Sequence, residues 1–179
     1  DVLEWLYSLG EIDITSEWLY SLGEIDITSN IKHLFWISYT NGNAHMCKRL
    51  YSIRTIRMKY IPNKELLNLC KNGHIDTIEF LYSIHKESIY SLRNNLFTTS
   101  CINGHERLAE WLYSLGDINY KKDYIFVECC RNGYENIAKW LYSLGGINID
   151  TVKNEAFLNS CMNGYLSLSK WLYSITYID

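Results

Sequence analysis

Two short motifs carry residue types that bind zinc in many proteins. Cys70 and His74 are separated by three residues, and Cys101 and His105 repeat that spacing 31 residues later. Zinc needs four ligands that converge at about 2.0–2.3 Å. Here the cysteine points into the predicted stack from a helix, whereas the histidine lies beyond an Asn-Gly turn. Two later copies carry tyrosine in place of the histidine, which a ligand position would not permit. We therefore expect no metal and no cofactor.

Nucleophilic catalysis would need a cysteine or serine beside a histidine and a carboxylate in one unique arrangement. Every cysteine and nearly every histidine is explained by its place in a repeated pattern. His33, His45 and His85 fall outside that pattern, but none has an evident partner. No phosphate-binding glycine loop and no pair of catalytic carboxylates stands out either. The sequence therefore predicts a protein that is not an enzyme.

These motifs recur because the chain is built from copies of one unit of about 31 residues. A Leu-Tyr-Ser triplet occurs seven times, and an Asn-Gly pair lies nine residues before each of the five triplets from Leu50 onward. Such a period is typical of stacked repeat proteins, and five units exceed the roughly three that a stable stack needs. The asparagine of each pair defines position 0 of its unit: Asn41, Asn72, Asn103, Asn132 and Asn163.

Each unit is predicted to contain two short helices joined by the Asn-Gly turn. Apolar or small residues at positions −6, −3 and −2 form a helical stripe, and position −2 is cysteine in four units. Glycine at position +1 ends the first helix. In the fourth unit the second helix reads Tyr134–Leu144, followed by a loop at Gly145–Thr151. Asn or Asp at position −9 predicts the N-caps of the first helices: Asn63, Asn94, Asp123 and Asn154.

The composition agrees with this plan. The 179 residues are 47% hydrophobic and 21% charged, and the single proline suits a mostly helical chain. No apolar run is long enough to span a membrane, and the first residues do not resemble a signal peptide. One cysteine per unit indicates core filling in a reducing, intracellular setting. The chain begins inside a unit without an initiator Met, so we expect a fragment or a trimmed product.

The segment from Phe157 through Asn163-Gly164-Tyr165 to Leu172-Tyr173 resembles an ankyrin repeat, and Gly-His itself is present in two units. The sequence of Asn103–Asn119 is similar to sequences of the divergent ankyrin proteins encoded by giant viruses of amoebae. The resemblance covers about residues 30–179 and implies an all-α, ankyrin-like helical-repeat solenoid. The Thr-Pro-Leu-His start is absent and the unit is about two residues short, so we expect short inter-repeat loops instead of a β-hairpin finger.

The expected organisation is a partial repeat at 1–29 followed by five repeats, at approximately 30–60, 61–91, 92–121, 122–152 and 153–179. Within the first segment, Glu4–Ser16 and Glu17–Ser29 are identical. This duplication is either a recent tandem copy or assembly error, or a tolerated surface insertion. We expect the second copy to continue into the first full repeat, and the first copy to be loosely docked or disordered.

Two further sequence patterns each have two possible interpretations. Trp111, Trp140 and Trp171 share position +8; they form either an aromatic ladder between adjacent second helices or an exposed strip that anchors a partner. The basic stretch Lys48–Lys64 could contact phosphates, but the pI is near 6.0 and an acidic segment precedes it. We expect a solvated loop there and no nucleic-acid partner.

The predicted recognition surface consists of positions −4 and −1, which vary while their neighbours stay constant. In an ankyrin-like stack these line the concave face, and with the loops they would bind a protein partner. The resemblance implies a viral protein that binds a host factor in the host cytoplasm. Alternatives are the substrate-recruiting part of a ubiquitin-ligase adaptor, or a structural or virion component. The ten residues are Ile37, Thr40, Asn68, Lys71, Thr99, Ile102, Glu128, Arg131, Asn159 and Met162.

Overall fold

The computed structural model describes residues 27–52, 61–116 and 118–176. This part of the chain consists of helices and turns without a strand, so the all-α prediction is confirmed. Most of the N-terminal segment 1–29, with its duplication, lies outside the described residues. The helices are α3 (Ile27–Thr40), α4 (Ala44–Ser52), α5 (Asn63–Lys71), α6 (Ile75–Ile84), α7 (Lys86–Ile102), α8 (Glu106–Ser114), α9 (Lys122–Arg131), α10 (Glu135–Ser143), α11 (Ile149–Met162) and α12 (Leu166–Thr176).

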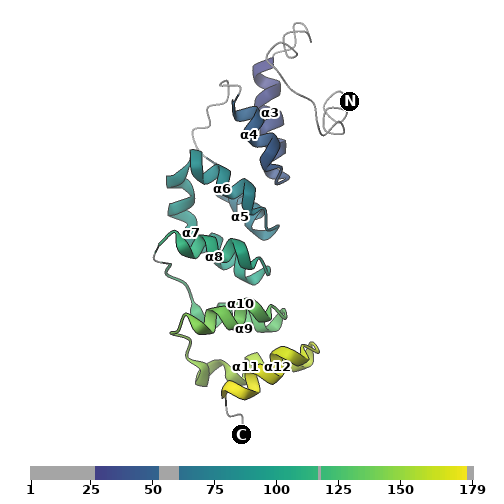
Figure 1. Ribbon diagram of the computed structural model, residues 1–179, viewed down its shortest axis with the longest axis vertical. Helices are drawn as coiled ribbons and strands as arrows, with labels where there is room; N and C mark the ends of the chain where they lie inside the picture. The colour runs from purple at the N-terminus through teal and green to yellow at the C-terminus, as the bar shows by residue number, and fades with distance from the viewer. Residues whose placement is uncertain (1–26, 53–60, 117, 177–179) are drawn as a thin grey trace.

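Consecutive helices form five pairs, and the pairs follow one another along the long axis of the molecule, from α3 and α4 at one end to α11 and α12 at the other (Figure 1). The first helices pack against each other in series, α3 on α5, α5 on α7, α7 on α9 and α9 on α11. Each first helix is therefore covered by the first helix of the next pair, as the buried stripe at positions −6, −3 and −2 requires.

The Asn-Gly turn has the same hydrogen bonds in all five pairs. In the second pair the N–H of His74 donates to the carbonyl of Leu69 at 3.0 Å, which is the wide bond of a Schellman motif. Gly73 has a φ of +73°, a region that favours glycine. His74 then adopts φ −77° and ψ 65°, and the N–H of Ile75 donates to the carbonyl of Gly73 at 2.8 Å. This inverse γ-turn starts the second helix at once.

The turns of the first four pairs are also covered by an aromatic ring from the following pair. A Cβ atom on Gly133 would lie 2.6 Å from the ring of Tyr165, so only glycine lets that ring approach. In the four later units position +2 therefore carries an aromatic ring that lies between two successive turns. Either histidine or tyrosine supplies this ring. The four glycine–ring contacts join Gly42 to His74, Gly73 to His105, Gly104 to Tyr134 and Gly133 to Tyr165.

The predicted N-caps at position −9 are wrong. Asn94 and Asn154 lie inside α7 and α11, Asp123 is the second residue of α9, and no side chain of Asn63 caps α5, which begins after Pro62. Helix α7 starts directly after His85 because Ile89, fully buried, extends the apolar stripe toward the N-terminus. Val152 does the same in α11. Both helices therefore run across the expected unit boundaries at 91/92 and 152/153.

Two of these polar side chains hold a loop instead of a helix end. Asn94 Oδ1 accepts from the N–H of Asn119 at 3.1 Å, and Asp123 Oδ1 accepts from the N–H of Asn148 at 2.9 Å. Each bond joins the first helix of a pair to the loop that follows its second helix. At Asn94 and Asp123 the residue type is therefore explained by a backbone donor 25 residues later in the chain.

The Leu-Tyr-Ser triplet has one structural task for each residue. The leucine is buried in every pair, as at Leu141. The serine hydroxyl donates to the carbonyl three residues earlier, as from Ser143 to Trp140 at 2.6 Å, and so adds a second hydrogen bond to a carbonyl in the last turn of the helix. The tyrosine contacts the next pair, as described below. The triplet is thus a helix C-terminus that also provides an inter-pair contact.

The cysteines at position −2 fill the core in the inner pairs, as predicted, but not in the last one. Cys70, Cys101 and Cys130 are fully buried, whereas Cys161 is exposed. The reason is that the next first helix covers this position, and the described chain places no helix beyond α11 and α12. None of the described helices has the length and apolar character needed to cross a membrane.

Candidate interaction surface

The ten predicted recognition residues all lie on first helices, and none of them is buried. Arg131 and Met162 are exposed, and others, such as Thr99 and Glu128, are half-buried. Their neighbours at positions −3 and −2 are buried in every inner pair. The ten residues therefore lie on five first helices that pack in series, and the helical period places positions −4 and −1 opposite the buried stripe. We call this row the first-helix face: Ile37, Thr40, Asn68, Lys71, Thr99, Ile102, Glu128, Arg131, Asn159 and Met162.

Two more positions belong to this side of the first helices. Positions −8 and −5 lie within 100° of −4 and −1 on a helical wheel. They include Tyr124, which is 51% exposed, and Trp36, which is 48% exposed and stacks on His33 at a centroid distance of 6.3 Å. The sequence analysis did not select these two positions, although they also vary between units. The helical period alone would have found them.

One charged cluster lies on α9 and α11, toward one end of the first-helix face. Arg131 is held by two carboxylates: Nη1 pairs with Glu128 on its own helix, and Nη2 lies 2.9 Å from Glu155 Oε1 on α11. The Arg131 and Glu155 side chains are 43% and 60% exposed. Exposed pairs of this kind contribute about 0–1 kcal/mol to stability. The cluster therefore offers a guanidinium and two carboxylates to solvent at little cost to the fold.

The two Cys-His motifs do not come together as a metal site. The Cys70 thiol is buried in the core, and burial raises its pKa to about 12. The ring of His74 instead lies over Gly42, and the His105 ring places Nε2 2.8 Å from the carbonyl oxygen of Lys71. Among the residues that the structure describes, no three metal-binding side chains converge. Each motif is explained by core packing and by the ring spacer.

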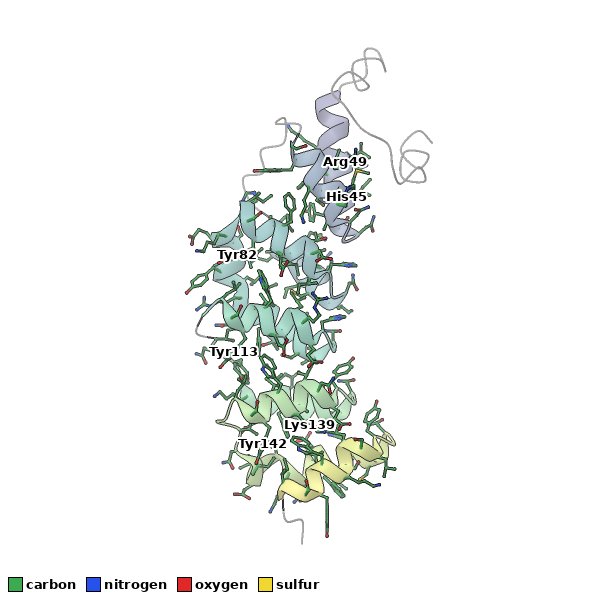
Figure 2. All side chains as sticks on the ribbon, viewed as in Figure 1. His45, Arg49, Tyr82, Tyr113, Lys139 and Tyr142 are labelled. Carbon is green, nitrogen blue, oxygen red and sulfur yellow. The ribbon has the colours of Figure 1, made fainter. Side chains whose placement is uncertain are left out.

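Burial also argues against the cysteines as nucleophiles. The pKa values of Cys47, Cys101 and Cys130 are each raised to about 12 by burial, so these thiols are protonated at neutral pH. Of the histidines outside the repeated pattern, His33 stacks on a tryptophan and His85 is the single residue between α6 and α7. His45 is exposed on α4 (Figure 2).

The aromatic ladder predicted for position +8 is confirmed. Each ring at this position meets the tyrosine of the preceding triplet edge to face, and Tyr82, Tyr113 and Tyr142 follow one another along one side of the molecule (Figure 2). Edge-to-face pairs contribute about 0.5–1.5 kcal/mol beyond their buried area. The four contacts are Tyr51–Phe80 at 5.7 Å, Tyr82–Trp111 at 5.4 Å, Tyr113–Trp140 at 5.5 Å and Tyr142–Trp171 at 5.7 Å.

The predicted basic loop falls largely outside the described residues, which omit 53–60. Of its described members, Lys48 is exposed on α4 and Arg49 is half-buried.

Comparison of the chain with protein-family models, with curated proteins and with solved structures gives no significant match.

Proposed function

We propose that the chain is a non-catalytic protein–protein interaction scaffold, built as an ankyrin-like helical-repeat solenoid, that binds its partner on the first-helix face and the adjoining loops. The observation that carries this proposal is the contrast within each first helix. Positions −6 and −3 are kept for packing in every pair, while positions −4 and −1 vary and stay accessible. A surface that changes while its support stays constant is what a binding protein needs.

The chemistry of the face favours a folded or extended protein partner over a small molecule. It combines apolar side chains, such as Ile102 and the 83% exposed Met162, with the Arg131 cluster and the aromatic rings of Trp36 and Tyr124. Arginine and aromatic residues are enriched at protein interfaces. By the ankyrin resemblance, this partner is a host factor met inside the cell.

Arg131→Ala tests the proposal, with Lys139→Ala as a matched control. Both side chains are 43% exposed and both pair with glutamate, but Lys139 lies on the second helix α10 and pairs with Glu135 at 2.6 Å. Each substitution should lower the free energy of unfolding by less than about 1 kcal/mol. Quantitative affinity purification from cells should show a partner retained by wild type and by Lys139→Ala, and at least about tenfold depleted with Arg131→Ala.

Equal recovery with both variants would count against the first-helix face. Depletion with Lys139→Ala alone would move the binding surface to the second helices. Urea denaturation of both variants checks that neither result arises from loss of the fold.

A further inference from the structure

The Asn-Gly pair of each turn has a reactivity that its role in the turn does not use. The backbone nitrogen of the glycine can attack the side-chain carbon Cγ of the asparagine. A new C–N bond then closes a succinimide ring, the Cγ–Nδ2 bond breaks, and Nδ2 leaves as ammonia with the proton of the glycine N–H. Water opens the ring to aspartate or isoaspartate. Glycine favours this deamidation because no Cβ hinders its nitrogen.

The folded turn holds this pair in a conformation from which the ring cannot close. Closure requires the glycine nitrogen to be eclipsed with the asparagine Cβ about the Cα–C bond. Asn72 has a ψ of −1° and Asn132 a ψ of 0°, so the glycine nitrogen is eclipsed with the asparagine nitrogen instead. The N–H of Gly73 also donates to the carbonyl of Cys70 at 3.3 Å, and the equivalent bond of Gly133 has the same length. A turn must therefore open before its asparagine can react.

A second restraint distinguishes the five asparagines from one another. In three turns the asparagine Nδ2 donates to the carbonyl four residues earlier, as from Asn132 to Glu128 at 2.8 Å. This bond holds the carboxamide against the last turn of its own helix. The asparagines that make it are Asn103, Asn132 and Asn163. Within the described part of the chain, the side chains of Asn41 and Asn72 make no hydrogen bond, so only the backbone restrains them.

Asn72 and Asn132 differ in this bond and in little else. Both are exposed, their φ values are −94° and −93°, and each follows a basic residue, Lys71 or Arg131. In both turns the carbonyl of that basic residue bonds to a side chain of the next pair. The comparison of the two asparagines therefore isolates the effect of the carboxamide bond.

We propose that Asn41 and Asn72 are deamidation sites of the folded chain, and that the carboxamide bond protects the asparagines of the other three turns. Reaction at Asn72 places a carboxylate at the C-cap of α5, where the helix dipole is already negative. The isoaspartate product also adds a CH2 group to the main chain, so the bond from His74 to Leu69 that closes the turn no longer spans the same number of atoms. The reaction requires no partner, so this proposal and the proposed binding function can fail separately.

The test follows deamidation of the full chain in native buffer and in concentrated urea, both at neutral pH. Samples taken over time are digested with pepsin in acid, which halts the reaction, and mass spectrometry measures conversion at each Asn-Gly pair. In urea Asn72 and Asn132 should convert at rates within about twofold of each other, since no turn remains. In native buffer both should convert at least about tenfold more slowly than in urea. There Asn72 should convert at least about threefold faster than Asn132, as expected from one net hydrogen bond.

Asn72→Gln confirms the assignment of the site. Glutamine must close a larger ring, which is much slower, so conversion at this turn should disappear while the rate at Asn132 stays unchanged. Circular dichroism checks that the variant keeps its helices, and the comparison within the wild-type chain stands without it. Equal native rates at Asn72 and Asn132 would overturn the proposal, because the carboxamide bond would then protect nothing. Native rates equal to those in urea would also overturn it, since the turn would then offer no protection.

Discussion

At the scale of single residues, one exception to the repeated pattern affects the stability of the fold. Position +5 is apolar in four pairs, as at Leu108 and Ile137, but it is Thr77 in α6. The Thr77 hydroxyl is fully buried and has no hydrogen-bond partner. A buried polar group without a partner lowers stability, because it gives up its bonds to water without replacement.

Thr77→Val should therefore raise the free energy of unfolding by about 1 kcal/mol, because valine fills nearly the same volume without the hydroxyl. Urea denaturation followed by circular dichroism measures the change. Ser100→Ala is the control, since the buried Ser100 hydroxyl donates to the carbonyl of Leu96 at 2.8 Å and its removal should give no gain. A loss of stability in Thr77→Val would show that the hydroxyl has a use within the fold.

The sequence predicted the structural roles of some residues correctly and those of others incorrectly. It identified the core positions because their periodicity is visible in five copies, and cysteine at position −2 is buried wherever a further pair covers it. It could not identify Asn94 and Asp123 as loop anchors, because the backbone donors they meet lie 25 residues away. Both residues are good N-caps in isolation, so local propensity gave the wrong role.

At the scale of helices and turns, the Asn-Gly turn was predictable and the helix starts were not. Glycine at position +1 is required twice, by its positive φ and by the ring of the next pair. The starts of α7 and α11 depend on Ile89 and Val152, which become buried only when the helices pack. Tertiary packing therefore lengthened two helices beyond the local signals.

The two requirements on the turn glycine can be separated by two substitutions. Gly133→Ala places a Cβ 2.6 Å from the Tyr165 ring at a φ of +75°, whereas Gly164→Ala meets no atom within 4 Å at a nearly equal φ of +77°. The backbone cost of about 1–2 kcal/mol applies to both. Gly133→Ala should lower the free energy of unfolding by about 1 kcal/mol more than this, because the ring must move. Equal unfolding free energies in urea would show that the ring contact does not contribute.

At the scale of the whole molecule, the spacer rings divide the stack by chemistry. The contacts over Gly42 and Gly73 use histidines, whereas those over Gly104 and Gly133 use tyrosines. Burial lowers the pKa of His74 from its usual value of 6.5, and the neighbouring His105 lowers it further. Only the part of the stack that contains the histidines should therefore respond to mild acid.

The sign of this response follows from the direction of the shift. Well above pH 6.5 His74 is neutral in both the folded and the unfolded chain, so it adds no pH dependence there. Below that pH the unfolded chain binds a proton before the folded chain does, and the free energy of unfolding falls until the folded His74 is also protonated. His74→Tyr should flatten this fall, because Tyr134 and Tyr165 occupy the same place in other pairs. Urea midpoints between pH 7.5 and about 5 measure it, and an unchanged slope would contradict the assignment.

The direction of the ring contacts has a consequence for biosynthesis. In each of these ring contacts the turn glycine or the triplet tyrosine belongs to the earlier pair, and the ring that packs on it belongs to the later one. A ribosome makes the N-terminal part first, so each new hairpin emerges next to a template that is already complete. The nascent chain can therefore fold one hairpin at a time in the order of translation, and no hairpin has to wait for a segment that has not yet been made.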